Sequence, residues 1–411
     1  MKVFISLHFY FVLSVLLGGI SLFLGGIFIE KMYLKPNLAR GLYTDATVLD
    51  EKYVQKGLLL FSPFIVKDNF TGKGRVYLTD LNGNIVHKWD TKYNTMYSLI
   101  MPNGYLYTAQ IIPANLSHAP GGGVTGLLQE LDLKGNVIWE YKDAMLHHDF
   151  DVDLESNTVY AIKFTPVSKS FSEKIQGGMF TKHTNFWSDT LVQIDRKGKI
   201  IWSWELQKNL KPDDFILNPI TPRDEWSHSN SVKFYKTNPI NNKPALLLSA
   251  RHLNTVFLID RETGKVLWKS PKGVFNYQHD ATLTDNGTIL VFDNGTSRMQ
   301  EKFSLWSRLV EVNLKDNKIV WQFKGGETGI EKMSFMSSIM SGAQRLPNGN
   351  TLGIDSLRGH IFEVTKEGKV VFSFINPYQS LDKTSPFGNN IIFKARKFPY
   401  SYFIDYKGIA K

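Results

Sequence analysis

Three histidines and one arginine occupy related positions in this chain. His148, His228 and His279 each begin a short apolar segment, and Arg251 directly follows the apolar segment after His228. A neutral imidazole can attack an electrophilic sulfur or phosphorus atom and leave again, which divides a group transfer into two steps. The planar guanidinium of arginine can hold two oxygens of a tetrahedral anion. These residue types together indicate an anion site with a nucleophile.

Asn230 and His147 are further candidates for the same site. Asn230 lies two residues beyond His228, so on a strand it shares the face of that histidine and adds an amide donor. His147 competes with His148, which we prefer because it aligns with the His-Asp pair at His279. A single histidine of this kind is more often a packed residue at a strand start. Three at equivalent positions favour a shared site.

A metal centre is the alternative, because three histidines can hold zinc. Asp149 and Asp280 directly follow their histidines, so on a strand their carboxylates would point to the opposite face. The acidic partners expected around a catalytic metal are therefore few, and we expect no metal. The chain also has no cysteine, which excludes a disulfide, a thiol nucleophile and a thiolate metal site.

A repeated phrase predicts the scaffold that positions these residues. Between Val76 and Phe374 the chain repeats six times an apolar strand, a tight turn and an apolar segment with an aromatic residue. The turn positions are Gly83, Gly135, Gly198, Gly264, Asn317 and Gly368. A blade of four antiparallel strands takes about 40 to 50 residues and needs a neighbour on each side to bury its faces. We therefore predict an all-β fold, a six-bladed β-propeller over residues 51–411.

The order of strands within a blade predicts where the candidate residues meet. Short turns alternate with longer connections, so all long insertions gather on one face, over residues 164–190, 207–227, 296–307 and 324–341. The strand starts that carry the histidines and the strand end that precedes Arg251 reach the same face. We expect these side chains to converge at the mouth of the central channel. Residues 393–399 are expected to complete the blade begun by residues 58–66 and so to close the ring.

The N-terminal residues differ in composition from the rest. Residues 3–29 contain no charge, and as a helix they would span roughly 40 Å, more than the ~30 Å hydrocarbon layer of a membrane. No clear cleavage site follows, so we predict an uncleaved transmembrane anchor at residues 1–30 and a linker at residues 31–50. Lys31, Lys35 and Arg40 favour a cytoplasmic propeller by the positive-inside rule, but large domains cross membranes largely regardless of charge.

The 411-residue chain has a formal net charge of +10, which is compatible with nucleic acid, anionic lipid or small anionic substrates. No run of five basic residues occurs, so the excess lysines are dispersed over the surface and do not indicate a nucleic-acid partner.

At the candidate residues the sequence resembles the bacterial arylsulfotransferases, which do not use phosphoadenylyl sulfate. The resemblance rests on three segments in order, residues 226–231, residues 249–252, and residues 278–280 with 292–295. It implies that His279 becomes transiently sulfated, and that His148, His228, Asn230 and Arg251 bind the sulfuryl group. It also implies a phenolic sulfate donor, a phenol acceptor and no cofactor.

The same resemblance implies an extracytoplasmic propeller, and hence an inner-membrane protein with a periplasmic domain. The N-terminal β-sandwich that mediates dimerisation in better-known members is replaced here by the predicted anchor, so we expect a monomer. Aromatic residues of the long loops are the predicted wall for the aryl ring: Phe180, Phe186, Trp187, Phe303 and Trp306.

Two other functions fit a propeller. A membrane-tethered binding or assembly platform predicts no effect from changes to the histidines. A quinone-dependent alcohol dehydrogenase predicts about eight blades and an acidic calcium pocket, neither of which the sequence supplies. A fold alone does not decide between such functions.

Overall fold

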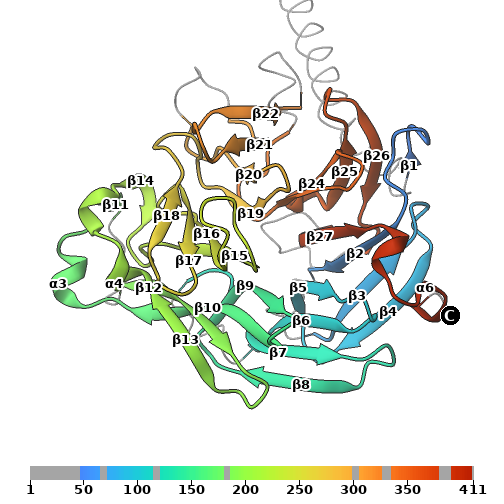
Figure 1. The fold of residues 1–411 in the computed structure, drawn as a ribbon, viewed down its shortest axis with the longest axis horizontal. Coiled ribbons are helices and arrows are strands. Elements are labelled where there is room, and N and C mark those ends of the chain that lie inside the picture. Colours follow the sequence, from blue (N-terminus) through green and yellow to red (C-terminus); the bar gives the residue numbers. More distant parts are fainter. Residues whose placement is uncertain are drawn as a thin grey trace, which may run out of the picture. The chain divides into compact units, whose positions relative to one another are not determined.

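Six antiparallel sheets surround a central axis, which confirms the predicted six-bladed propeller (Figure 1). This computed structural model describes residues 47–64, 72–113, 121–179, 186–298, 305–325, 335–378 and 390–409. The predicted transmembrane helix at residues 1–30 lies outside these ranges. Within them, no helix has the length and apolar character needed to cross a membrane.

The strands follow one another from the axis outward in each blade. The first blade contains β27 (Ile392–Phe398), β2 (Leu58–Pro63), β3 (Gly74–Thr79) and β4 (Ile85–Thr91). The second contains β5 (Thr95–Ile100), β6 (Leu106–Ile111), β7 (Gly126–Leu131) and β8 (Val137–Lys142). The third contains β9 (Leu146–Asp153), β10 (Thr158–Pro166), β12 (Trp187–Ile194) and β13 (Ile200–Glu205).

The remaining three blades repeat this order. The fourth contains β15 (Ser229–Tyr235), β16 (Ala245–Ala250), β17 (Thr255–Asp260) and β18 (Val266–Lys269). The fifth contains β19 (His279–Leu283), β20 (Thr288–Asp293), β21 (Arg308–Asn313) and β22 (Ile319–Phe323). The sixth contains β23 (Gly342–Arg345), β24 (Thr351–Asp355), β25 (His360–Val364) and β26 (Val370–Ile375), with β1 (Thr47–Val48) paired to its outer edge. β1 lies within residues 31–50, the segment expected to be a linker.

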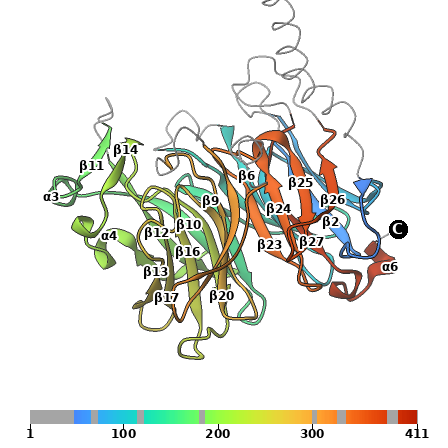
Figure 2. The same cartoon turned by 90° about the horizontal axis from the view of Figure 1, so that it is seen from above.

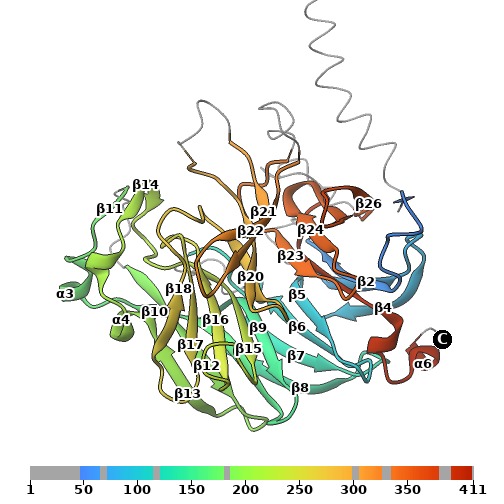
Figure 3. The same cartoon turned by 45° about the horizontal axis from the view of Figure 1, so that its top comes forward.

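The described helices are single turns. They are α3 (Lys169–Ser172), α4 (Leu206–Asn209), η2 (Pro212–Asp214), η3 (Ser356–Arg358), η4 (Tyr400–Tyr402) and α6 (Tyr406–Ile409). The long connections of the third blade also form a small parallel pair, β11 (Gly177–Met179) with β14 (Leu217–Pro222). This pair and α3 project from the edge of the propeller (Figures 2 and 3).

The hydrophobic core lies between neighbouring blades. One cluster joins Tyr160 and Leu191 of the third blade to Leu246 and Phe257 of the fourth. Another cluster joins the fourth blade to the fifth in the same way. Neighbouring blades therefore bury apolar faces against one another, which is the physical reason that the repeat forms a closed ring.

A tryptophan hydrogen bond connects each of the first five blades to the next. The indole Nε1 of an outer-strand tryptophan donates to a turn of the following blade at 2.7 to 3.1 Å. The five pairs are Trp89 with Asp132, Trp139 with Arg196, Trp204 with Gly264, Trp268 with Asn317 and Trp321 with Lys366. The outer strand of the sixth blade carries Phe372 and Phe374, which have no such donor.

The C-terminal strand closes the junction between the sixth and first blades, as predicted from residues 393–399. β27 pairs with β2 from Leu58↔Phe398 to Pro63↔Ile392. The last strand of the chain is thus the innermost strand of the first blade. It brings Phe393 and Lys394 to the axis of the propeller.

Candidate functional site

A cavity of about 320 Å³ opens on the face of the long insertions and contains four of the five predicted site residues. His148, His228, Arg251 and His279 line it together. The apolar part of the wall comes from Phe64, Met96, Ile111, Val124, Ile339, Met340 and Phe393. A small pocket that is apolar except for a few convergent polar groups is typical of a ligand site.

The innermost strands position the three histidines. His148 lies in β9, His228 directly precedes β15 and His279 begins β19. Arg251 directly follows β16, and its backbone N–H donates to the His228 carbonyl at 3.1 Å. Because each residue stands at the same end of an inner strand, the ring of blades directs all four towards one point. The His148 and His228 ring centres are 4.7 Å apart.

Left-handed backbone conformations concentrate at this cavity. The φ angles of His148, His228 and Met340 are 57°, 44° and 58°, and Tyr277 and Asp280 nearby have φ angles of 56° and 55°. Residues other than glycine rarely adopt this backbone conformation, and such backbone strain often occurs at functional sites. The strand pairing is irregular at the same places, with register shifts after His279 and between Ser229 and Ser231. These irregularities aim the side chains in directions that regular alternation does not allow.

His279 has one defined tautomer. Its Nδ1 lies 2.8 Å from Asn294 Oδ1, while Asn294 Nδ2 donates to the carbonyls of Ser337 and Met340 at 2.7 and 3.1 Å. Because the amide nitrogen already donates, Oδ1 must accept, so the proton of His279 is on Nδ1. Its Nε2 then carries the lone pair, and no described residue forms a hydrogen bond with it. Burial is the main cause that lowers the pKa of His279 well below its ordinary value, so the ring is neutral at pH 7.

His148 and His228 are also neutral. Burial lowers the pKa of His228 to about 3, with the charge of Arg251 as the second cause. The pKa of His148 is lowered by burial and then by the neighbouring His228. His147, the rival to His148, does not line the cavity. Its Nδ1 lies 2.8 Å from His148 Nδ1 and its Nε2 lies 3.1 Å from Asp189 Oδ1, so it contacts the site from behind.

Arg251 is a buried cation that has no carboxylate partner among the described residues. Within the described ranges it forms no ion pair, and its buried Nε has no hydrogen-bond acceptor. Its guanidinium lies 4.4 Å from the ring centre of Tyr277. Burial lowers the pKa of Arg251 to about 10, so the group remains charged at neutral pH. A buried guanidinium with an unused donor is suited to an anionic ligand.

Asn230 does not line the cavity. Its side-chain nitrogen donates to the Gln278 carbonyl at 2.8 Å, and its Oδ1 is buried without a partner. The two-residue spacing from His228 does not place it on the same face because the left-handed backbone at His228 and the register shift at Ser229 interrupt the alternation. Its role in binding the sulfuryl group stays a prediction.

The apolar wall is also different from the predicted one. Phe180 and Phe303 lie outside the described residues. Phe186, Trp187 and Trp306 do not line the cavity. The side chains that do, among them Met96, Ile339 and Met340, come from inner strands and from connections that carry no aromatic pattern.

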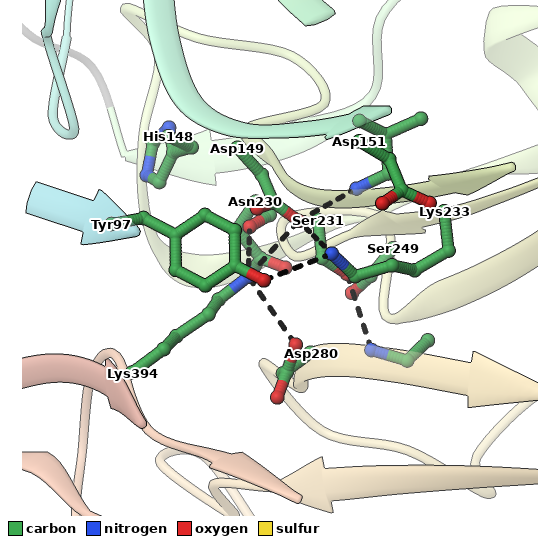
Figure 4. Close-up of polar contacts among 12 residues, drawn as sticks. Tyr97, His148, Asp149, Asp151, Asn230, Ser231, Lys233, Ser249, Asp280 and Lys394 are labelled. Carbon is green, nitrogen blue, oxygen red and sulfur yellow. Dashed lines mark hydrogen bonds and ion pairs between the residues drawn. The ribbon is translucent and has the colours of Figure 1, made fainter. Parts of the chain in front are cut away.

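A buried group of charges lies on the axis next to the cavity (Figure 4). Lys394 Nζ is 3.1 Å from Asp149 Oδ2 and 3.3 Å from Asp280 Oδ1, and all three side chains are inaccessible to solvent. Arg396 also binds Asp280, at 2.6 Å. The carboxylates that follow His148 and His279 therefore turn away from the cavity and bind cations. In the described part of the chain, no group of three His, Cys, Asp or Glu side chains is arranged to hold a metal ion.

Sequence reasoning missed two features of the site, Glu225 behind the cavity and a glycine segment in its wall. Glu225 is buried and its Oε2 lies 2.6 Å from His228 Nδ1. The Gly121-Gly122-Gly123 segment packs against the site, and a Cβ atom at Gly123 would lie 2.1 Å from the His148 ring. Three consecutive glycines were a signal for close approach of the backbone. The sequence contained no such signal for Glu225, because its contact with His228 depends on how the connection before β15 folds.

Comparisons with known proteins identify the family of this chain. A solved structure of a protein of unknown function from Bacteroides caccae has a TM-score of 0.49 and 12% identity, covering 83% of this chain and 99% of that one. At this score the likeness supports no argument. The arylsulfate sulfotransferase AssT of Lelliottia amnigena is 25% identical over 371 residues, covering 71% of this chain and 59% of that protein.

The corresponding AssT of Escherichia coli O6:H1 is 24% identical, covering 64% of this chain and 55% of that protein. The chain thus spans somewhat more than half the length of these relatives. The family described as arylsulfotransferase (ASST) matches residues 111–377, which include His148, His228, Arg251 and His279. The chain belongs to the arylsulfotransferase family.

Proposed function

We propose that this protein transfers a sulfuryl group from an aryl sulfate to a phenol through a sulfated His279. The observation that carries the proposal is the meeting, in one cavity, of a neutral histidine with a free Nε2 lone pair and a cationic arginine without a carboxylate partner. Family membership supports the sulfuryl group as the transferred anion.

In the proposed first step, His279 Nε2 attacks the sulfur atom and the bond from sulfur to the phenolic oxygen breaks. Arg251 donates to sulfuryl oxygens and stabilises the charge that develops on them. The aryl ring lies against the apolar wall that includes Met96, Ile339 and Phe393. In the second step, the oxygen of an acceptor phenol attacks the same sulfur and His279 leaves.

The test is the turnover of a chromogenic aryl sulfate by the full chain, with and without a phenolic acceptor. We expect ping-pong kinetics and an 80 Da adduct, one SO₃ group, on the peptide that carries His279. His279→Ala should abolish phenol release. Arg251→Ala and His228→Ala should each lose about 2 to 4 kcal/mol of transition-state stabilisation. Wild-type turnover by His279→Ala would refute the mechanism, and no turnover by the wild-type chain would favour the binding platform.

We also propose that residues 1–30 anchor the protein in the inner membrane, with the propeller in the periplasm. The uncharged residues 3–29 support this. A reporter enzyme fused after Lys411 should be active only outside the cytoplasm. Activity only in the cytoplasm would show that the orientation is wrong.

A further inference from the structure

Glu225 is a buried carboxyl group without a lysine or arginine partner among the described residues. It lies in the connection between β14 and β15 and is 3% exposed. Its Oε2 is 2.6 Å from His228 Nδ1, on the side of the ring away from Nε2. Burying an acid without a cation is costly, so the group must be held neutral or share a proton.

The backbone around Glu225 is shaped to receive this carboxyl group. The Gly122 N–H donates to Oε1 at 2.9 Å. A Cβ atom at Gly121 would lie only 1.1 Å from Oε1, so glycine is required at that position. Both oxygens therefore have a fixed partner, Oε1 with the backbone and Oε2 with His228.

The charges around Glu225 disfavour its ionised form. Burial and then Asp189 raise the pKa of Glu225 to about 8, with a further contribution from Asp224. His147 and the Gly122 N–H act in the opposite direction but are outweighed. The ionisable groups that face the pair are Asp189 of β12, His147 and His148 of β9, His279 of β19, Asp224, Arg251 and His252. Because the pKa of His228 is far lower, the shared proton is on Glu225 at neutral pH and is donated to His228 Nδ1.

We propose that Glu225 and His228 form a two-residue proton store that protonates the departing phenol and later takes the proton back from the acceptor. His228 faces the reacting groups, and Glu225 is a positioning residue that acts through it. The inference rests on the proposed sulfuryl transfer and assigns the proton that this reaction requires.

The proton and charge balance closes over the two steps. When the sulfur to oxygen bond breaks, the phenolate oxygen takes the proton from His228 Nε2, and the Glu225 proton moves to His228 Nδ1. Glu225 is then a carboxylate, and it carries the negative charge that the donor brought in. In the second step the acceptor phenol gives its proton to His228 Nε2, His228 Nδ1 returns its proton to Glu225, and the starting state is restored.

The test compares donors whose phenols differ in acidity, using Glu225→Gln in the full chain. Glutamine keeps a donor for His228 Nδ1 and an acceptor for the Gly122 N–H, but it cannot release a proton. A donor whose phenol has a pKa of about 10, as tyrosine does, needs protonation on departure, so its single-turnover release should slow by about 100-fold. The much more acidic 4-nitrophenol leaves as the anion, so its release should slow far less.

The pH profile supplies an independent readout. In the wild-type protein, release of the poor leaving group should fall above pH of about 8, where Glu225 loses its proton. Glu225→Gln should lack this decline. Glu155→Gln, at an exposed carboxylate paired with Lys236, is the matched control and should behave as the wild type.

The outcomes separate the two proposals. If the wild-type protein releases neither phenol, the sulfuryl transfer itself is wrong. If the wild type is active but Glu225→Gln slows both donors equally and keeps the alkaline decline, the proton store is wrong and Glu225 has only a structural role.

Discussion

The tautomer of His279, the proposed nucleophile, depends on Asn294, a neighbour that does not line the cavity. Asn294 fixes the proton on Nδ1 because its own amide nitrogen is already engaged by two backbone carbonyls, of Ser337 and Met340. Those carbonyls lie in the connection before β23, which also supplies Ile339 and Met340 to the cavity wall. The orientation of His279, the proposed nucleophile, and the shape of the pocket thus depend on one connection.

Asn294→Ala tests this dependence. Without the acceptor, His279 can place its proton on either nitrogen, and the attacking lone pair on Nε2 is present only part of the time. We expect kcat to fall by about 10- to 100-fold, with a smaller change in KM. Asn82→Ala, at an exposed turn, is the control. An unchanged kcat in Asn294→Ala would show that the tautomer is fixed by something else.

The acid limit of activity follows from the pKa of His279. A protonated imidazole has no lone pair on Nε2 and cannot attack sulfur. Because burial lowers this pKa well below the ordinary 6.5, activity should persist as the pH falls through 6.5 and decline only at lower pH. The measurement is kcat/KM against pH with a chromogenic donor. A half-maximal rate near pH 6.5 would contradict a buried, neutral His279.

At the scale of elements, a recurring hydrogen bond from a tryptophan connects neighbouring blades. The position of this tryptophan in the outer strand differs from blade to blade. The tryptophan is four residues after the turn glycine in the second blade, at Trp139, and six residues after it in the third, at Trp204. Positions two apart share a strand face, so either one can reach the next blade.

Trp139→Phe should lower the free energy of unfolding by about 1 kcal/mol more than a Trp→Phe change at a position without this hydrogen bond, since the donor to Arg196 is lost as well as part of the ring. Urea titration of the full chain measures this. Trp202→Phe, at an outer-strand position without an inter-blade hydrogen bond among the described residues, serves for comparison and should change stability less. Equal losses in both variants would mean that ring size, not the hydrogen bond, determines the effect.

The blades and the closing strand could be predicted because the repeat is local: glycine turns with positive φ, such as Gly135 at 83°, separate strands of period two. The convergence of His148, His228, Arg251 and His279 followed from that topology alone. The position of Asn230 could not be predicted from the topology, because a register shift at the start of β15 interrupts the alternation of side chains between the two faces of the strand. Glu225 and Met340 could not be predicted, because connections of irregular backbone place them.

At the scale of the whole molecule, three blades meet at Lys394. This residue of β27 binds Asp149 of β9 and Asp280 of β19, so one fully buried cation connects the first, third and fifth blades across the axis. Losing such a cation leaves buried carboxylates without part of their compensation, which costs far more than the loss of a surface pair.

Lys394→Met should therefore destabilise the protein by about 3 kcal/mol. The double change Lys394→Met with Asp149→Asn should recover part of that loss, because it also removes one of the uncompensated charges. Both values come from urea midpoints of the full chain. A loss of under about 0.5 kcal/mol in the single variant would show that Asp149 and Asp280 do not need Lys394 for the stability of the fold.

The position of β27 also determines when the protein acquires its site. During synthesis β27 is made after the other strands that the structure describes, yet it lies innermost in the first blade and supplies Phe393 to the cavity and Lys394 to the axis. A chain that stops before residue 392 has all three histidines and Arg251 but lacks part of the pocket wall and the cation that joins the blades. His279, the proposed nucleophile, thus reaches its final setting only after β27 has been made, and a chain that terminates before residue 392 carries the chemical groups without the site.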